Sequence, residues 1–328
     1  MRRLVLQAMR YSGMFFLARS LTAAMPRILM YHNFGGPGAS DADALNTEGI
    51  RRQFEYLRTH FHVVPLLQLA EQLASGREPG KYSVALTIDD GRRNCYEYLF
   101  PMLKEFELPA TFFVVSSFIN GEDWIWTDKV LWLSETPNCP EGLERGQLSA
   151  TFRAMNRMRP EERNARIQHF AELAGVSIPR TAPPKYSPCS WSELREMADS
   201  GWMEIGSHTA THPILSSLTD EESRHELEES RRQIEEGIGR EVSSFCFPNG
   251  MPGDYRESQV RQVAEAGYVC GMAAHSGLVS AASDRYALPR IGVATKSKLV
   301  EFSKYLDGID YYQHRLGTWL RAHDAHDS

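Results

Sequence analysis

The feature that most constrains the fold is an alternation of short apolar runs with helix-like segments. Runs rich in β-branched and aromatic residues recur at 28–31, 62–65, 83–88, 110–115, 203–206, 243–247, 268–273 and 286–293. Between them, Ser190 with Glu193 and Thr219 with Glu222 have the spacing of capping boxes, which predicts two helix starts. Strands that alternate with helices build βα units and a largely parallel sheet. The chain is therefore expected to be an α/β protein.

Two clusters of metal-binding residue types follow predicted strands. Asp89 and Asp90 come directly after the run 83–88, and His208 and His212 follow the run 203–206. The carboxyl ends of strands carry the chemistry in α/β barrels. Two imidazoles and one carboxylate are the ligand set of an open catalytic metal site, which leaves a position for water. The second carboxylate is then free to act as a base on that water.

Each cluster taken alone also has a structural explanation. An Asp-Asp-Gly triplet, here residues 89–91, commonly makes a strand-ending turn, because Asp bonds to nearby backbone and Gly accepts a positive φ. Two histidines four residues apart lie on one face of a helix, where they can simply cap or pack. The metal interpretation therefore depends on the two clusters occurring together.

Five segments in the same order resemble the polysaccharide deacetylases, the NodB-homology domain of carbohydrate esterase family 4. They are residues 28–32, 87–91, 108–114, 207–212 and 245–250, and the first resembles the exopolysaccharide-deacetylase branch. The resemblance implies a distorted (β/α)7 barrel. It also implies that residues 121–188, between the two metal motifs, are a helical insertion.

The resemblance assigns roles to the two clusters. Asp90, His208 and His212 would hold a divalent metal, with Zn²⁺ the expected ion, and Asp89 would be the catalytic base. The implied reaction is metal-dependent removal of N-acetyl groups from an acetylated polysaccharide or a sugar intermediate of its biosynthesis. O-deacetylation, hydrolysis of a non-sugar amide, and a catalytically inactive glycan-binding protein are the alternatives.

The third motif departs from the family pattern. Pro248, Asn249 and Gly250 match the substrate-binding turn, in which the N–H of Asn249 would stabilise the oxyanion. Many relatives have Arg two residues before that proline, whereas this chain has Cys246. Arg290, in the last predicted strand, could supply the missing charge to the base. The alternative for Arg290 is a surface salt bridge.

The general acid is the second departure. The family's usual acid is a histidine in a Leu-x-His motif, but residues 288–290 read Leu-Pro-Arg. His32, at the end of the first strand, and His275, after the run 268–273, are the two candidate substitutes. His32 is preferred because the exopolysaccharide branch has a histidine at that position.

Three regions are predicted. Residues 1–25 form a basic amphipathic helix, which lies either on a membrane surface or against the domain. Residues 26–316 form the deacetylase domain, and 317–328 form a C-terminal tail. In the insertion, Trp126 either stacks on a substrate sugar or anchors the insertion to the barrel. No run is long enough to span a membrane and no export signal is convincing, so the expected location is cytoplasmic, with membrane association open.

Composition limits the partners. The net charge is −6, from 36 basic and 42 acidic residues, which gives no support for a nucleic-acid partner. An acetylated glycan or glycan precursor is the expected partner. The five cysteines have no metal-type spacing and indicate no disulfide framework.

Overall fold

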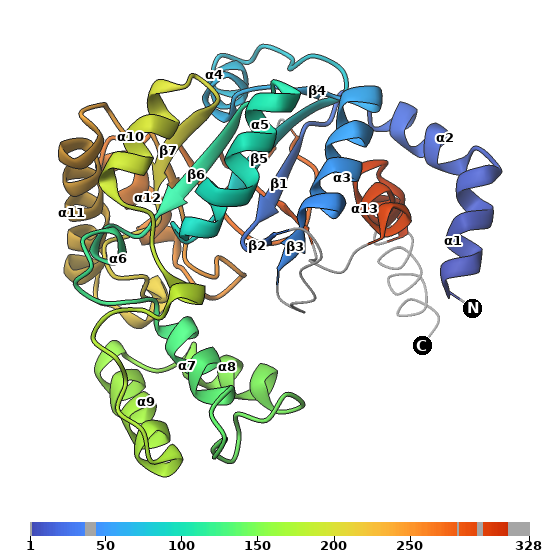
Figure 1. Ribbon diagram of the computed structural model, residues 1–328. Coiled ribbons are helices and arrows are strands. Elements are labelled where there is room, and N and C mark those ends of the chain that lie inside the picture. Colours follow the sequence, from blue (N-terminus) through green and yellow to red (C-terminus); the bar gives the residue numbers. More distant parts are fainter. Residues whose placement is uncertain (1, 37–43, 281, 294–297, 314–328) are drawn as a thin grey trace, which may run out of the picture.

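The computed structural model describes residues 2–36, 44–280, 282–293 and 298–313. The predicted tail, 317–328, and the last residues of the predicted domain, 314–316, lie outside the described residues. Figure 1 shows a curved central sheet wrapped by helices, with a separate group of helices, α7 to α9, projecting from one end.

All paired strands of the central sheet run parallel. Its order is β10-β1-β5-β6-β7-β8-β9, and β4 pairs with β5 beside this path. The bounds are β1 Arg27–Tyr31, β4 His62–Val63, β5 Ser83–Ile88, β6 Ala110–Val114, β7 Met203–Ser207, β8 Ser244–Cys246, β9 Cys270–Met272 and β10 Ile291–Gly292. Each strand falls on a predicted run, so the predicted α/β class is confirmed. A short parallel pair, β2 Phe34–Gly35 and β3 Leu45–Asn46, was not predicted.

The last predicted strand closes the ring in two steps. The N–H of Leu288 donates to Gly271 of β9, and the N–H of Ala273 donates back to Leu288, both at 2.9 Å. After Pro289 the chain crosses to the other edge, where Ile291 pairs with Leu29 of β1. The prediction of one strand over 286–293 is therefore wrong in extent, because a proline has no N–H with which to continue a ladder.

Helices cover the outside of the ring. Their bounds are α3 Thr47–His60, α4 Leu66–Ala74, α5 Phe100–Phe106, α6 Ser116–Ile119, α10 Trp191–Asp199, α11 Asp220–Ile238, α12 Glu257–Glu265 and α13 Leu299–Leu306. Both predicted capping boxes form. The hydroxyls of Ser190 and Thr219 accept from the N–H groups of Glu193 and Glu222, at 3.2 Å each. These caps set the starts of α10 and α11.

The buried apolar side chains of the sheet fall into two clusters, one on each face of the strands. On β1, Ile28 belongs to one cluster and Leu29 to the other, and on β6 Phe113 and Phe112 divide in the same way. This alternation is that of strands buried on both faces. The interior is therefore filled with side chains, and chemistry is confined to the rim.

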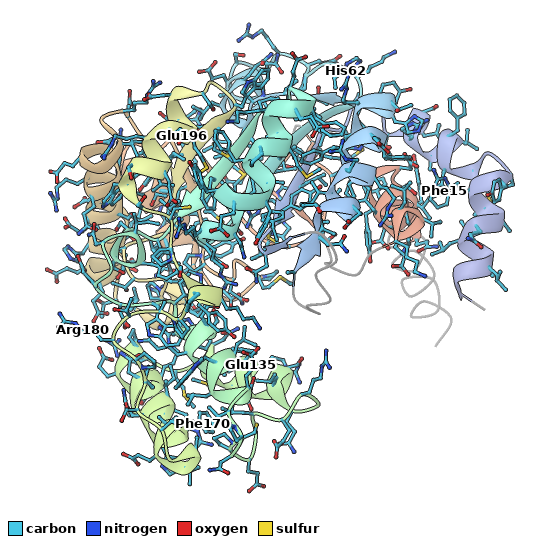
Figure 2. All side chains as sticks on the ribbon, in the orientation of Figure 1. Phe15, His62, Glu135, Phe170, Arg180 and Glu196 are labelled. Atoms are coloured by element: carbon cyan, nitrogen blue, oxygen red, sulfur yellow. The ribbon has the colours of Figure 1, made fainter. Side chains whose placement is uncertain are left out.

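The insertion forms a helical unit with its own core. It contains α7 Trp126–Ser134, α8 Leu148–Met155 and α9 Pro160–Ala174, and Pro160 occupies the first turn of α9 as its sequence predicts. The buried side chains of this unit include Val130, Leu133, Met155, Ile167 and Phe170. Phe170 is labelled within the unit in Figure 2.

The N-terminal segment is two helices rather than the predicted single one. α1 (Arg2–Tyr11) and α2 (Met14–Leu21) are separated at Gly13, whose φ of 83° breaks the helix. Leu6, Phe15 and Ala18 pack against Val300 and Ile309 of the domain, and Figure 2 labels Phe15 between α2 and α13. No helix among the described residues is both long enough and apolar enough to cross a membrane.

Candidate metal and catalytic site

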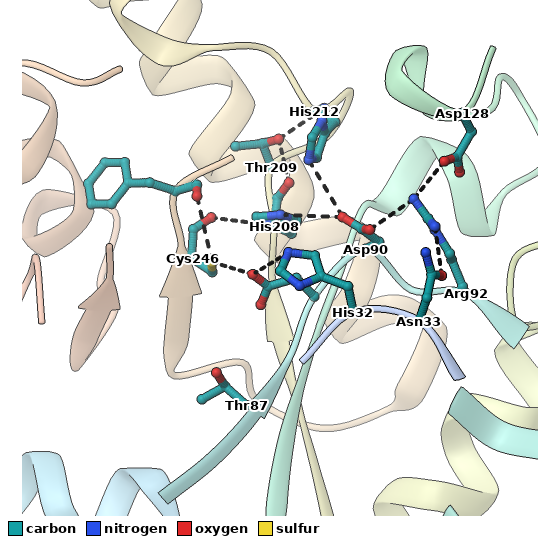
Figure 3. A network of polar contacts seen from close by, with 12 residues as sticks. His32, Asn33, Thr87, Asp90, Arg92, Asp128, His208, Thr209, His212 and Cys246 are labelled. Atoms are coloured by element: carbon teal, nitrogen blue, oxygen red, sulfur yellow. Dashed lines mark hydrogen bonds and ion pairs between the residues drawn. The ribbon is translucent and has the colours of Figure 1, made fainter. Parts of the chain in front are cut away.

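The candidate site lies at the carboxyl ends of β5, β7 and β8. Directly after β5 the chain turns sharply, with φ of 84° at Asp90 and 91° at Gly91. A positive φ is uncommon for a residue other than glycine, and such strain persists only where surrounding contacts hold it. Asp89 and Asp90 are 2% and 6% exposed. The turn therefore presents two buried carboxylates at the rim (Figure 3).

The three predicted metal ligands converge. Oδ1 of Asp90 lies 3.8 Å from Nε2 of His208 and 3.7 Å from Nε2 of His212. These separations exceed a hydrogen bond. They suit ligand atoms that each lie about 2.0–2.2 Å from one shared ion. Figure 3 shows His208 and His212 directed toward the Asp90 carboxylate. The residues present therefore fit a divalent metal.

The histidines are in the form that a metal requires. Nδ1 of His208 lies 2.8 Å from the carbonyl oxygen of Cys246, so it donates there and leaves Nε2 with a free lone pair. Burial lowers the pKa of His208, and burial with the neighbouring His208 lowers the pKa of His212 to about 3. Both rings are neutral at physiological pH, which is the state that binds metal.

The two histidines meet across a loop rather than on a helix face, so the helical explanation of their spacing is wrong. Residues 208–212 follow β7 as a loop, with φ of 69° at Thr209 and 60° at His212. Glu226 of α11 holds this loop. Its carboxylate accepts from the N–H groups of Ala210 at 2.8 Å and Thr211 at 2.9 Å, and from the Thr211 hydroxyl at 2.6 Å.

Arg290 holds the predicted base. Its Nη1 and Nη2 donate to Oδ1 and Oδ2 of Asp89, at 2.7 Å each. Nη2 also lies 3.1 Å from Sγ of Cys246, the residue that replaces the family's arginine. Arg290 is 1% exposed, so the surface-salt-bridge alternative is wrong. Burial would raise the pKa of Asp89, but the Arg290 guanidinium outweighs it and holds that pKa below its usual range.

A second arginine joins the insertion to Asp90, a candidate metal ligand. Nη2 of Arg92 lies 3.1 Å from Oδ2 of Asp90 and donates to Oδ1 of Asp128 at 2.6 Å. Asp128 belongs to α7 and is fully buried, and burial raises its pKa to about 7. The Arg92 side chain also donates to Oδ1 of Asn33 at 2.6 Å. Sequence reasoning missed both charged residues, although Arg92 follows Asp90 by only two positions.

The two candidate acids differ in position. Nε2 of His32 lies 3.8 Å from Oδ2 of Asp89, and the His32 side chain is 44% exposed. His275 is half-buried, and its Nδ1 has no hydrogen-bond partner in the described part of the chain. Its contact with the site runs through its backbone oxygen, which accepts from the N–H of Arg290 at 3.1 Å. The geometry favours His32.

The third motif forms a tight turn. Asn249 and Gly250 have φ of 58° and 61°, and the oxygen of Gly250 accepts from the N–H of Ala274 at 2.8 Å. A Cβ at Gly250 would lie 2.9 Å from that nitrogen, so only glycine fits. Pro248 is buried. Within the described residues the N–H of Asn249 donates to no group, so it is available to a ligand.

Trp126 does not offer an open ring for sugar stacking. It is 5% exposed and packs in the core of the insertion, where the Arg163 guanidinium lies 4.6 Å from its ring centre. Trp124 is 4% exposed, and its Nε1 donates to the oxygen of Pro179. The anchoring alternative describes both rings, because an aromatic face must be exposed to stack on a sugar.

A parallel ring with an Asp–His–His group and a second carboxylate at its rim is the arrangement of a barrel hydrolase. A family model described as polysaccharide deacetylase matches residues 76–271. The chain belongs to the polysaccharide deacetylase family.

Individual relatives are distant. YxkH of Bacillus subtilis (strain 168), which is named as a polysaccharide deacetylase, is 20% identical over 287 residues, covering 86% of this chain and 76% of that protein. The poly-beta-1,6-N-acetyl-D-glucosamine N-deacetylase of Escherichia coli (strain K12) is 23% identical over 291 residues, covering 80% of this chain but 35% of that protein.

The fold is shared with solved deacetylases. The Streptococcus pyogenes deacetylase PplD, solved in complex with acetate, superposes with a TM-score of 0.60. The match covers 87% of this chain and 99% of that one at 17% sequence identity. This similarity confirms the predicted distorted (β/α)7 fold.

Proposed function

We propose that the protein is a metal-dependent hydrolase that removes N-acetyl groups from a glycan or a glycan precursor. The observation that carries the proposal is the convergence of Asp90, His208 and His212 beside a carboxylate, Asp89, that Arg290 keeps ionised. A divalent ion, with zinc the best match to two imidazoles and one carboxylate, would supply Lewis-acid polarisation and a water of lowered pKa when bound.

The side chains around that position divide the remaining work. Asp89, ionised and buried, accepts the proton of the attacking water as that water adds to the acetyl carbonyl carbon. The free N–H of Asn249 stabilises the oxyanion that develops. His32, which lies 3.8 Å from Asp89, relays the proton to the amine nitrogen as the C–N bond breaks. The products are acetate and a free amino sugar.

The choice of an N-acetylated glycan rests on the relatives. The Escherichia coli relative is named for poly-N-acetylglucosamine de-N-acetylation, although this chain spans about a third of its length. A cleft of about 430 Å³ borders the site between barrel and insertion, with lining residues that include Asn33, Tyr98 and Tyr186. Its mix of aromatic and amide groups suits a sugar chain. Esters and non-sugar amides remain the alternatives for the same machinery.

Acetate release tests this function. Purified protein is incubated with an N-acetylglucosamine oligomer, with an O-acetylated sugar and with a non-sugar acetamide, before and after chelation and with metal added back. We expect chelator-sensitive acetate from the oligomer, restored best by Zn²⁺. Metal-dependent release only from the ester or the acetamide would replace the N-deacetylase assignment. A protein that binds no metal and releases no acetate would support a glycan-binding role.

We also propose that the α1–α2 segment rests on an anionic membrane surface. Its outward face exposes large apolar side chains, with exposed fractions of 71% at Leu4, 65% at Phe16, 58% at Leu17 and 64% at Leu21. Residues 1–25 contain four arginines and no acidic residue. An apolar face on a segment that carries only positive charge suits the interface of anionic lipids.

A further inference from the structure

Arg92 connects three parts of the chain beside the candidate metal site. Its Nη1 donates to Oδ1 of Asn33, just after β1, at 2.6 Å. Its Nη2 lies 3.1 Å from Oδ2 of Asp90, which follows β5, and 2.6 Å from Oδ1 of Asp128 in α7. Figure 3 shows the guanidinium between these three side chains. Because the Arg92 side chain is only 6% exposed, water competes little for these contacts, and the cation is held from three sides.

The contact with Arg92 divides the two oxygens of Asp90 between two partners. Oδ1 faces the Nε2 atoms of His208 and His212, at 3.8 and 3.7 Å, whereas Oδ2 faces the guanidinium. The last torsion of an aspartate side chain is soft, and a carboxylate can bind an ion through one oxygen or through both. Arg92 restrains that torsion and leaves one oxygen for the ion. A site with three ligand atoms from the protein keeps its fourth position for water.

A cation beside a metal site needs a counter-charge. A guanidinium and a divalent ion repel each other, and the repulsion grows where water is excluded. Asp128 supplies the compensating negative charge, since it is fully buried and pairs with Arg92 at 2.6 Å. Trp126 and Val130, on either side of Asp128 in α7, are buried in the core of the insertion. The insertion therefore fixes the position of the carboxylate that lies behind Arg92.

We propose that Arg92 and Asp128 are positioning residues for the metal site. Arg92 holds the Asp90 carboxylate so that a single oxygen faces the two histidines. Asp128 holds Arg92 in place and neutralises its charge, so that the guanidinium does not oppose metal binding. The insertion is then a working part of the metal site. This inference rests on the proposed function, because it takes Asp90, His208 and His212 as the metal ligands.

The affinity of the full-length protein for Zn²⁺, measured by competition with a chelator, tests this role. We expect Asp128→Asn to raise Kd by about 10- to 100-fold, the range typical of groups that orient metal ligands. Arg92→Gln should raise Kd by a smaller factor, because it removes the restraint on Asp90 but also removes the opposing charge. Asp123→Asn is the matched control and should leave Kd unchanged, because Asp123 belongs to the insertion but is 59% exposed and pairs with Lys129.

A double-variant cycle separates positioning from a general loss of structure. Because Asp128 acts through Arg92, adding Asp128→Asn to Arg92→Gln should raise Kd no further. Additive losses in the double variant would overturn the inference. So would a lower thermal unfolding midpoint of Asp128→Asn with an unchanged Kd. If Asp128→Asn fails to fold, Asp128→Glu keeps the charge but displaces the carboxylate by one methylene, and it should still raise Kd. An unchanged Kd in Asp128→Glu would then overturn the inference.

The measurement of Kd does not depend on turnover, so it distinguishes this inference from the proposed function. A Kd that depends on Asp128 in a protein that releases no acetate would keep the positioning role and reject the deacetylase function. Metal-dependent acetate release with a wild-type Kd in Asp128→Asn would do the reverse.

Discussion

Asp89 is held by a guanidinium that comes from an unexpected part of the chain. In many relatives the charge beside the base comes from the third motif, where this chain has Cys246. Here Arg290 occupies the same role from 201 residues away, with two hydrogen bonds of 2.7 Å to the carboxylate. The thiol of Cys246, whose pKa burial raises, fills the remaining space as a small neutral group.

Replacing Asp89 tests whether it is the base and not a metal ligand. Asp89→Asn keeps the shape of the side chain but removes the charge that accepts a proton. We expect kcat to fall by a factor of about 10² or more while bound metal stays at the wild-type level. Metal content is measured by elemental analysis and kcat by acetate release. His208→Ala is the matched loss of a ligand and should lose both metal and activity. Wild-type kcat in Asp89→Asn would remove Asp89 from the role of base.

The convergence of Asp90, His208 and His212 could be predicted from the sequence because these residues stand just after strands. The groups that support it could not. Arg92 and Asp128 are 36 residues apart, and a charged residue in a loop gives no sign of which partner it will meet. The stacking role of Trp126 was wrong for a related reason. The tryptophans of an insertion show that it has a core, but not which ring faces are covered.

The loop 208–212 is a short element kept in an unfavourable conformation. Two of its non-glycine residues, Thr209 and His212, have positive φ, and a conformation of this kind costs on the order of 1–3 kcal/mol per residue. Glu226 offsets that cost by accepting three hydrogen bonds from the loop. Sequence periodicity placed α11 and its capping box, yet it could not show that one glutamate of this charged helix faces inward.

Weakening that anchor should weaken metal binding. Glu226→Gln leaves a single acceptor oxygen where the carboxylate served the whole loop. We expect metal affinity to fall by about 10- to 100-fold, the usual effect of losing a group that orients metal ligands. A chelator-competition titration measures it, with saturating metal restoring most of the activity. Glu228→Gln, on the exposed side of the same helix, is the control. An unchanged metal affinity in Glu226→Gln would show that the loop keeps its conformation without the Glu226 carboxylate.

At the scale of the molecule, two additions surround the barrel. The insertion extends beyond one end of the ring, and the α1–α2 segment packs beside α13 (Figure 1). The insertion reaches back to the site through Asp128, whereas the α1–α2 segment packs against α13 and exposes large apolar side chains. The sequence identified the insertion by its break in the strand–helix alternation, and the N-terminal segment by its arginines and its apolar residues at helical spacing. How these regions pack could not be predicted, because their packing depends on contacts with distant parts of the chain.

The α1–α2 segment should bind vesicles through its exposed apolar face. We expect the protein to float with vesicles that contain anionic phospholipid and to remain unbound with neutral ones. A triple variant that carries Leu4→Ser, Phe16→Ser and Leu17→Ser should not float. Leu173→Ser, which changes an equally exposed leucine on α9, should leave it intact. A different result would assign this face to a second copy of the chain. In that case the wild type does not float but forms a dimer without lipid, and the triple variant loses that dimer.

The position of Arg290 has a consequence for synthesis on the ribosome. All three candidate metal ligands have been synthesised once residue 212 is added, but the guanidinium that holds Asp89 comes later, with Arg290 in the segment between β9 and β10. A nascent or prematurely ended chain would therefore carry ligands without a fixed base. The segment that closes the ring also supplies the contact that holds the candidate base, so the candidate site is complete only when the domain is complete.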